Sequence, residues 1–571
     1  MENWVVAAKK ADFNEIAEKF GIDPVVARII RNRDVIGDEA IETYLYGGLD
    51  KLNSPSLLKD MDKAAGILLK KIESGARIRV IGDYDIDGIM ASYILKRGLL
   101  ELGGNADIKI PNRMTDGYGL NENMIEAAFR DGIDTIVTCD NGIAAADAVA
   151  RAKEHGMTVI VTDHHEVLEI PSADAVVDPK RPDDDSPNPN LCGAAIAWKL
   201  ILAMGGDPDM KMLQYAAFAT VGDIVELTGE NRIIVKEGLK QLRNTDNAGL
   251  KALADVQGLK LDALTTYHIG FVLGPCLNAS GRLDTAMRAS ALLEAPNQKA
   301  AQHLAEELKS LNESRKSLTE SGVRIARETI EKTGLLGDRI LVVFLPEVHE
   351  SIAGIIAGRV REIYSRPAFV LTRSADGVKG SGRSTETYSM FEELTKVQDL
   401  LIRFGGHPMA AGLTLAEEHV DEFRRRINEC CELTMEELVP KVRIDVPMPI
   451  SYVSEKLIEQ LKLLEPYGKG NEKPLFAEKN VYCEHPRLFG ARHNLLKMRV
   501  RSMVVPGDAE PDRPGFQART AGQAQDAVCF RNVDELYERI CKSPDVALAY
   551  EVEFNDYMGQ RRIQIVITHF Q

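Results

Sequence analysis

The sequence predicts an α/β fold followed by a β-barrel, on the basis of three observations. From residue 77 to residue 178, short apolar runs alternate with stretches of helical apolar spacing, which is typical of a parallel sheet covered by helices. A long charged segment, residues 298–332, then leads to a second α/β pattern from residue 339. After about residue 440 the segments are β-rich and separated by polar loops, which indicates a C-terminal barrel.

The length of 571 residues exceeds what one hydrophobic core usually supports, so two to four domains are expected. No internal repeat is evident. The predicted parts are an N-terminal helical cap (1–60), a parallel-sheet domain (61–297), a connecting helix (298–335), a second α/β domain (336–438) and the barrel (439–571).

The first domain contains five apolar runs that we expect to form its strands. These are residues 78–81, 106–110, 133–139, 158–162 and 173–177. The helical segments expected between them are residues 88–102, 121–130 and 143–155. This alternation predicts right-handed βαβ units, and further helices are expected from about residue 193 to residue 330.

Residues 298–332 carry Leu or Ala at intervals of three and four among many charges, which predicts one long helix. A solvated coiled-coil arm is one interpretation, and a connector between domains is the one we favour. The second α/β domain should contain strands 340–344, 368–372 and 377–383 and a helix at 351–364.

Five β-rich segments follow in the C-terminal region, and five is the number of strands in an OB-fold barrel. The expected strands are residues 476–482, 496–500, 527–530, 547–554 and 560–568. Residues 505–525 are rich in Pro, Gly and polar side chains, so we expect a long loop there.

Composition restricts the function only weakly. The net charge of −16 argues against a nucleic-acid-binding protein when taken over the whole chain, but a local basic groove remains compatible with it. Eight Cys without a CxxC pair indicate reduced thiols, neither a disulfide framework nor a zinc finger. No signal peptide and no apolar run of roughly 20 residues is apparent, so a cytoplasmic location without membrane contact is expected.

Four short acidic clusters are the strongest chemical signal in the sequence. They are Asp83-Tyr84-Asp85-Ile86-Asp87-Gly88, Asp140-Asn141-Gly142, Asp163-His164-His165 and Gly222-Asp223. The first three directly follow β-forming runs, and ligands collect at the carboxyl ends of parallel strands. Carboxylates brought together in this way repel one another unless a cation neutralises them, so the clusters predict a metal site.

Other interpretations explain single clusters but not all four. Asp-rich turns commonly cap helices, and a lone His pair is often structural. The first cluster also resembles the start of an EF-hand, but Ile94 stands where the loop needs Glu, and a strand precedes it. Carboxylates with imidazole suit Mn²⁺ or Mg²⁺ better than zinc. The number of carboxylates favours two ions with a bridging ligand, which act in hydrolysis of phosphoesters or phosphoanhydrides.

The four clusters in this order resemble the DHH phosphoesterase superfamily. Three further segments resemble its RecJ branch: residues 111–120 (PNRMTDGYGL), 277–283 (LNASGRL) and 464–471 (LEPYGKGN). Residues 404–412 (FGGHPMAAG) are similar to the glycine-rich motif of the DHH-associated domain. The resemblance runs from about residue 45 to the C-terminus. It implies a DHH catalytic domain, a DHH-associated domain beyond the long helix, and a C-terminal OB-fold.

The family degrades single-stranded DNA from the 5′ end to 5′-mononucleotides in DNA repair and recombination. By resemblance, two Mn²⁺ or Mg²⁺ ions are held by Asp83, Asp85, Asp87, Asp140, His164 and Asp223. Asp140 would bridge the ions, and His165 would contact the scissile phosphate or orient a ligand. The implied catalytic residues are Asp140, His164 and His165.

The resemblance also implies substrate-binding residues outside the acidic clusters. Arg113, Ser381 and Arg383 would hold the 5′-phosphate, helped by backbone N–H groups of a 380–382 loop. Arg282 and His407 would hold the strand, and Tyr118 would stack on a base. The alternatives to a substrate-binding role are a surface turn for Arg113 and an ordinary buried aromatic side chain for Tyr118. The implied partners are single-stranded DNA, single-strand DNA-binding protein and a helicase.

Two rival functions stay open at this point. The first is a DHH phosphodiesterase that acts on short oligoribonucleotides or other small nucleotides, which the C-terminal barrel disfavours. The second is a non-catalytic replication scaffold, which the complete set of carboxylates disfavours. The sequence departs from the family pattern at Ile81, at Cys276 and in residues 348–351, and these departures bear on substrate preference more than on hydrolysis.

Overall fold

The computed structural model describes residues 2–571 except residues 114, 115, 118, 375, 376, 435, 491, 492, 505–518 and 558. The chain forms two compact units, which we name for the parts of the sequence that supply them. The central unit consists of Leu52–Val225 and Ile234–Pro440. The terminal unit consists of Met1–Lys51, Glu226–Ile233 and Lys441–Gln571.

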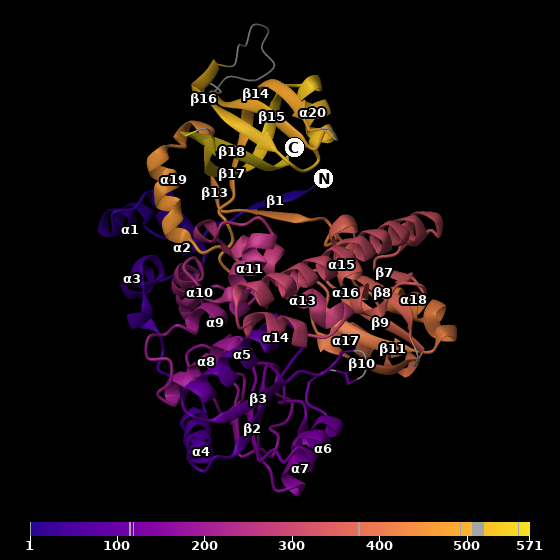
Figure 1. Ribbon diagram of the computed structural model, residues 1–571. Coiled ribbons are helices and arrows are strands. Elements are labelled where there is room, and N and C mark those ends of the chain that lie inside the picture. The colour runs from indigo at the N-terminus through magenta and orange to yellow at the C-terminus, as the bar shows by residue number, and fades with distance from the viewer. Residues whose placement is uncertain are drawn as a thin grey trace. The chain divides into compact units, whose positions relative to one another are not determined.

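The central unit begins with a five-stranded, entirely parallel sheet of order β3-β2-β4-β5-β6 (Figure 1). Its strands are β2 (Arg77–Gly82), β3 (Asn105–Lys109), β4 (Thr135–Cys139), β5 (Thr158–Thr162) and β6 (Ala175–Val177). The helices connecting or contacting them are α4 (Met61–Glu73), α5 (Ile86–Glu101), α6 (Glu122–Arg130), α7 (Ala146–Glu154) and α8 (Gly193–Ala203). Apolar residues of α6 and α7 share a core with Ile136, Val159 and Val161 of the sheet. The predicted βαβ arrangement is confirmed.

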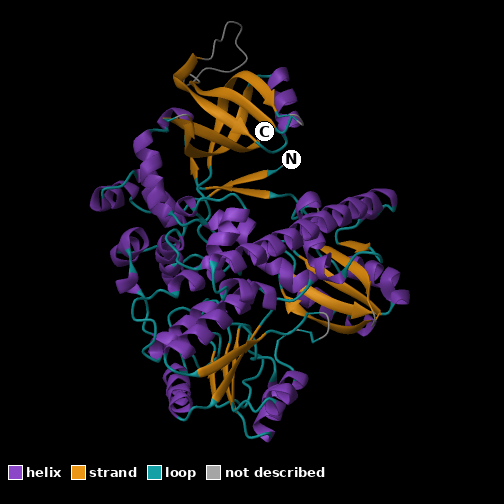
Figure 2. Ribbon diagram, viewed as in Figure 1, coloured by secondary structure: helices purple, strands orange, loops and turns teal. Residues whose placement is uncertain are grey.

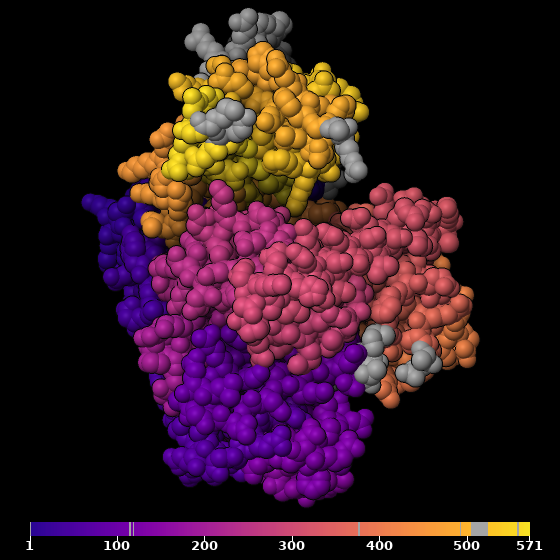
Figure 3. Space-filling view, in the orientation of Figure 1, coloured from indigo at the N-terminus to yellow at the C-terminus, as the bar shows by residue number. Residues whose placement is uncertain are grey.

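A helical region links this sheet to the second one. It comprises α9 (Leu213–Gly222), α10 (Gly229–Leu242), α11 (Ala248–Val256), α12 (Thr266–His268), a π-helical turn (Ile269–Leu273), α13 (Gly274–Leu283), α14 (Met287–Leu293) and α15 (Gln298–Lys332). The long helix α15 has the predicted limits. In the space-filling view, the pink residues of the helical region adjoin the orange residues of the second sheet domain (Figure 3).

The second sheet is mixed, with order β10-β11-β9-β8-β7, and only β7 and β8 are parallel. Its strands are β7 (Leu341–Phe344), β8 (Ala368–Ser374), β9 (Gly377–Arg383), β10 (Leu401–His407) and β11 (Ala410–Leu415). Helix α16 (Glu350–Tyr364) packs with the end of α15 on one face. Helices α17 (Met390–Thr395) and α18 (Val420–Glu429) pack on the other (Figure 2).

The glycine-rich residues 404–412, for which no strand was expected, form the hairpin of β10 and β11. The strand expected at 377–383 is confirmed as β9. The loop expected at Gly380–Gly382 is therefore wrong, because these residues lie within β9, which pairs with β8 on one side and β11 on the other. Their backbone N–H groups face these two strands, so a backbone anion site at this place is excluded.

The terminal unit is built around a closed β-barrel. Its sheet has order β13-β14-β15-β16-β18-β17 and closes through pairing of β14 with β17. The elements are β13 (Val446–Pro447), α19 (Glu455–Leu461), β14 (Phe476–Phe489), β15 (Leu495–Val504), β16 (Arg519–Cys529), α20 (Val533–Lys542), β17 (Asp545–Tyr557) and β18 (Gln560–Phe570). The predicted C-terminal barrel is confirmed. Part of the expected 505–525 loop is strand, because β16 already begins at Arg519.

The N-terminal segment contributes to the same unit. Strand β1 (Asn3–Val6) pairs in parallel with β12 (Lys441–Ile444), and α1 (Phe13–Phe20), α2 (Pro24–Asn32) and α3 (Asp38–Tyr46) follow. Apolar residues of these helices share one core with α19 and the barrel strands. The helices were expected, but β1 was not. In the part of the chain that the structure describes, no helix is long and apolar enough to cross a membrane.

Arg232 joins the three chain segments of the terminal unit. Its buried guanidinium donates hydrogen bonds to the carbonyl oxygens of Tyr44 (3.1 Å), Leu464 (2.9 Å) and Leu463 (2.8 Å). It also lies 4.2 Å from the centre of the Tyr44 ring, a cation–π contact. Buried carbonyl groups need hydrogen-bond donors. Arg232 supplies them to carbonyl groups of the N-terminal segment and of the C-terminal segment at the same time.

We predict that Arg232→Met destabilises the terminal unit by about 3 kcal/mol or more, because several buried carbonyls lose their donor. Hydrogen exchange followed by mass spectrometry should show faster exchange in β14–β18. Lys240→Ala, on the exposed side of the same helix, is the matched control and should leave exchange unchanged. Equal exchange in both variants would contradict this role of Arg232.

Candidate active site

The acidic clusters meet at one edge of the parallel sheet. Asp83, Asp140 and Asp163 are the first residues after β2, β4 and β5, which are neighbouring parallel strands. Asp140 has a left-handed backbone conformation, with φ of 60°, which non-glycine residues adopt at a cost of about 1–3 kcal/mol. Such strain is concentrated at functional sites, where the surrounding structure holds it in place.

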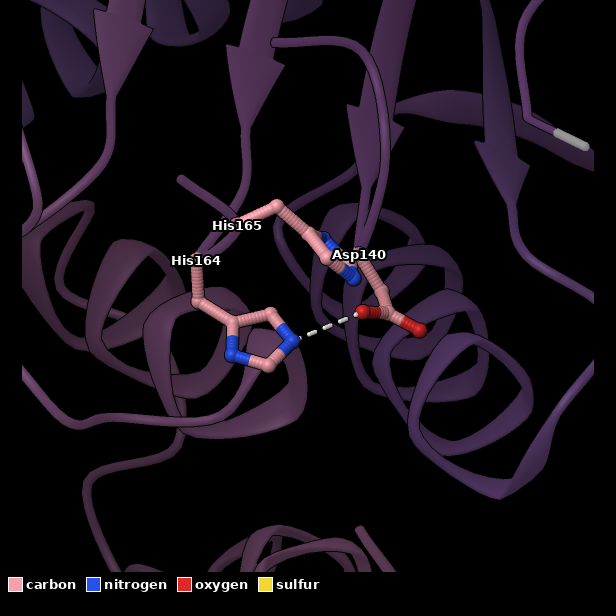
Figure 4. Close-up of side chains that lie close together, drawn as sticks. All are labelled: Asp140, His164 and His165. Carbon is pink, nitrogen blue, oxygen red and sulfur yellow. Dashed lines mark hydrogen bonds and ion pairs between the residues drawn. The ribbon is translucent and has the colours of Figure 1, made fainter. Parts of the chain in front are cut away.

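The predicted metal ligands, together with His165, form three overlapping groups, and within each group the possible ligand atoms lie within 4.8 Å of one another. The groups are Asp83–Asp85–Asp140, Asp87–His164–Asp223 and Asp140–His164–His165. Asp140 and His164 each belong to two groups. Figure 4 shows the Asp140 and His164 side chains pointing toward each other, with His165 beside them. The structure therefore brings together all seven residues predicted from the acidic clusters.

His164 lies at the centre of this cluster. Its Nε2 atom is 3.0 Å from Asp140 Oδ1, 3.5 Å from Asp87 Oδ2 and 3.9 Å from Asp223 Oδ2. Burial lowers the pKa of His164, so the ring is neutral near pH 7 and keeps a lone pair for a metal ion. These distances are compatible with a shared cation between the imidazole and the carboxylates.

The carboxylates are too crowded to be charged without a counter-ion. Burial, reinforced by neighbouring aspartates, raises the pKa of Asp87 and Asp223 to about 7 each and the pKa of Asp83 and Asp140 well above the ordinary value. Asp83 Oδ1 is buried and accepts no hydrogen bond from any residue that the structure describes. An uncompensated buried oxygen is costly, so these residues fit divalent cations.

His165 has the opposite electrostatic character. Burial works against its charged form, but Asp163 raises the pKa of His165 to about 9, with Oδ1 of Asp163 2.7 Å from Nδ1. The buried Asp163 also accepts the Ile143 and His164 N–H groups at 2.9 and 2.8 Å. His165 is thus a fixed cation beside the carboxylate cluster. The anchoring role of Asp163 was not predicted from the sequence.

Asp87 and two glycines fix the geometry of the cluster. The Asp87 carboxylate accepts the Gly193 and Ala194 N–H groups at 2.6 and 2.7 Å, so it also caps the start of α8. A Cβ atom on Gly193 would lie 2.7 Å from Asp140 Cβ, and one on Gly88 would lie 2.4 Å from the Asp83 backbone. Only glycine permits these two close approaches.

A cationic pocket lies next to the cluster within the central unit. A cavity of about 430 Å³ is lined by Arg113 and Tyr84 from the first sheet domain and by Ser381 from β9. The Arg113 guanidinium carbon is 5.1 Å from the centre of the Tyr84 ring. Ser381 and Arg383 point to the same face of β9, toward Gly354 of α16, where a Cβ atom would meet both side chains.

The other predicted substrate-binding residues have different surroundings. Arg282 donates to the Ser351 carbonyl at 3.2 Å, and burial together with nearby Arg113 lowers its pKa to about 10. His407 is exposed at the end of β10, outside the residues that line the cavity. It is in the same cross-strand row as Arg383, since both pair with Ala410. Tyr118 lies outside the described residues.

Sequence reasoning missed Lys379 and Arg403, which also line the cavity. Lys379 directly precedes residues 380–382, and Arg403 directly precedes the glycine-rich residues 404–412. Whether the two side chains lie on the same face of the sheet depends on strand register. That register pairs Lys379 with Thr414 and Thr414 with Arg403. The motif at 404–412 signalled the segment, but it could not show which side chains share a face.

Comparisons with known proteins agree with this arrangement. Residues 77–222 match the N-terminal domain of the DHH family, residues 337–433 the DHHA1 domain and residues 444–508 the RecJ OB domain. The single-stranded-DNA-specific exonuclease RecJ of Bacillus subtilis is 33% identical over 97% of this chain and 68% of its own length. RecJ of Salmonella typhimurium is 33% identical over 98% of both chains.

A solved structure shows the same fold. RecJ from Thermus thermophilus in complex with Mn²⁺ matches with a TM-score of 0.82 and 27% identity, covering 100% of this chain and 79% of the other. A second structure of that protein is a complex with Mg²⁺. Three family domains in the same order, with identities above 30% over nearly the whole length, show that this chain belongs to the RecJ family.

Proposed function

We propose that this protein is a metal-dependent exonuclease that degrades single-stranded DNA from the 5′ end and releases 5′-mononucleotides. The observation that carries the proposal is the adjacency of two features in the central unit, the carboxylate cluster and the arginine-lined cavity. The relatives named single-stranded-DNA-specific exonuclease, and the neighbours solved with Mn²⁺ or Mg²⁺, support it.

The carboxylate cluster suits two divalent ions, Mn²⁺ or Mg²⁺. Asp83, Asp85 and Asp140 would hold one, and Asp87, His164 and Asp223 the other, with Asp140 as the bridging ligand. Two bound ions would supply an activated water and charge stabilisation for the displaced oxygen.

His165 and Arg282 act on the phosphate itself in this proposal. The His165 imidazolium, held by Asp163, would neutralise charge that develops on the phosphoryl oxygens. Arg282, whose guanidinium is close to Asp85 and Arg113, would fix the strand at the scissile bond. A water oxygen bonds to phosphorus, the P–O3′ bond breaks, and the proton passes to O3′.

The cavity would determine where cleavage starts. Arg113 and Ser381 line the cavity, and Arg383 lies beside Ser381 where Gly354 of α16 leaves space for both side chains. Together they would supply two guanidinium groups and a hydroxyl for a terminal 5′-phosphate. A strand held by its 5′ end places its first phosphodiester near the carboxylate cluster. The products are then 5′-mononucleotides.

The barrel would add sequence-tolerant affinity for single strands. It carries exposed Phe489 with the Lys497 ammonium 5.1 Å from the ring centre, a combination suited to base stacking and phosphate contact. We further propose that the protein acts in DNA repair and recombination, where it contacts single-strand DNA-binding protein and a helicase. The predicted domain limits are also part of this proposal.

We expect the full chain with Mn²⁺ to degrade a 5′-phosphorylated single-stranded oligonucleotide to mononucleotides and to leave a duplex of the same sequence intact. A block at the 5′ end should stop degradation, and a block at the 3′ end should not. The reverse pattern would overturn the polarity. A dinucleotide RNA and a cyclic dinucleotide assayed in parallel test the small-substrate alternative.

Asp140→Asn should lower kcat by a factor of about 1,000 or more, because the bridging ligand serves both ions. Calorimetric titration with Mn²⁺ should show loss of at least one binding event. Asp147→Asn, on the exposed surface of α7, is the matched control and should titrate like the wild type. Near-normal turnover of Asp140→Asn would exclude the two-ion arrangement.

Asp223→Asn should stabilise the protein when metal is absent. The raised pKa means that Asp223 favours the folded state while protonated, so stability is lost as the pH rises from its ordinary 3.8 through about 7. The metal-free variant should therefore melt a few degrees above metal-free wild type at pH 8 and at the same temperature at pH 4. Mn²⁺ should raise the Tm of the wild type more than that of the variant. If the Tm of the metal-free variant and that of the metal-free wild type changed with pH in parallel, this electrostatic account would be contradicted.

A further inference from the structure

The cavity floor is one face of the second sheet, and its chemistry follows from strand register. Residues directly opposite one another on paired strands point to the same face. Three successive rows across β10, β11 and β9 lie on this face: Arg403–Thr414–Lys379, Gly405–Gly412–Ser381 and His407–Ala410–Arg383. Two cationic rows thus border a central row that contains two glycines and a serine.

The cavity extends beyond the predicted site for one terminal phosphate. Ser381 of the second row lines the cavity, and Arg383 of the third row lies beside it, whereas the lining residues continue to Lys379, Arg403 and Thr414 of the first row. Alternate residues of a strand are about 7 Å apart, so the first row lies about 7 Å from the Ser381 row along the strands. A volume of about 430 Å³ falls within the roughly 300–1,000 Å³ of small-molecule pockets and exceeds the need of one phosphate.

The charge of the first row is only partly balanced. Lys379 Nζ lies 3.0 Å from Glu350 Oε2, at the start of α16. For the exposed Arg403, no ion pair is found among the residues that the structure describes. The far end of the cavity therefore offers one unneutralised guanidinium and one lysine shared with a carboxylate. Thr372 and Thr414 add hydroxyl groups beside them.

We propose that this far end holds the second and third phosphates of a 5′-triphosphorylated strand, which makes such a strand a substrate. The inference rests on the proposed 5′-end exonuclease function. The first phosphate occupies the Arg113–Ser381 part of the cavity, and the others extend over the glycine row to Arg403 and Lys379. A triphosphate end is the one left wherever a strand is begun from a nucleoside triphosphate.

The chemistry gives this substrate a distinctive first product. Water adds its oxygen to the phosphorus between the first and second nucleotides, the P–O3′ bond breaks, and O3′ takes the proton. The triphosphate is not cleaved, so the first nucleotide leaves as a nucleoside 5′-triphosphate. The shortened strand carries a 5′-monophosphate and is degraded as before.

The test uses the full chain with Mn²⁺ and three otherwise identical single-stranded DNA oligonucleotides that carry a 5′-hydroxyl, 5′-monophosphate or 5′-triphosphate. Chromatography of the products should show one nucleoside triphosphate per triphosphorylated strand, followed by mononucleotides. Release of pyrophosphate, or no degradation of this strand, overturns the proposal. Failure of the monophosphorylated strand to be degraded from its 5′ end instead overturns the proposed function.

Two variants in the first row should shift end selectivity in opposite directions. Arg403→Ala should lower the ratio of kcat/KM for the triphosphate end over the monophosphate end about tenfold, the worth of one charged hydrogen bond. Glu350→Gln should raise that ratio several-fold, because it removes a negative charge facing the phosphates. Arg425→Ala, an exposed arginine on α18 paired with Glu422 and Glu429, is the matched control and should leave the ratio unchanged.

A strand backbone that passes over Arg403 is the competing explanation for its position. In that case Arg403→Ala would lower kcat/KM by the same factor for all three 5′ ends, and the proposal would be wrong. Because each result is a ratio between two substrates of one enzyme preparation, partial misfolding of a variant cannot imitate it.

Discussion

Mutual repulsion among buried carboxylates is the constraint on which the site depends. The parallel strands β2, β4 and β5 end side by side, and each is followed immediately by an aspartate. Asp83, Asp87 and Asp140 are almost fully buried, so water cannot screen their charges. The fold tolerates this arrangement through hydrogen bonds from α8, the neighbouring imidazoles and close glycine contacts. The charge balance that these contacts leave unfinished fits divalent cations.

Much of the fold was predictable because its periodicity is local. Apolar runs followed by aspartates indicated the parallel sheet and the edge on which Asp83, Asp140 and Asp163 meet. The Leu and Ala residues at intervals of three and four among many charges predicted both ends of α15. By contrast, β1 pairs with β12 from the other end of the chain, and no local pattern reports such a partner. Gly405, Gly406 and Gly412 disguised β10 and β11, since glycine has low strand propensity and the pairing with β9 overrides it.

The acidic cluster of the candidate site could be predicted from the sequence more completely than the cationic cavity. The acidic motifs were enough to indicate the seven residues that lie together, although Asp223 follows helix α9 and not a strand. The cavity was harder, because it depends on register, which decides that Lys379 and Arg403 share a face with Ser381. Net charge was a poor guide here. A chain of net charge −16 still concentrates Arg113, Lys379 and Arg403 around one cavity, whose lining includes a single acidic residue, Glu350, among the residues that the structure describes.

The composition of the terminal unit limits how such a protein can be rearranged. This unit combines the N-terminal helices and the C-terminal barrel, which share one core, with a short internal segment around Arg232. Arg232 follows Asp223 by nine residues in the chain, so one short stretch supplies a residue to the terminal unit and a residue to the carboxylate cluster. A C-terminal deletion would therefore strip carbonyl partners from a buried guanidinium and expose apolar faces of α1–α3. The barrel is not an interchangeable cassette, and recombination between relatives should preserve it together with both distant segments.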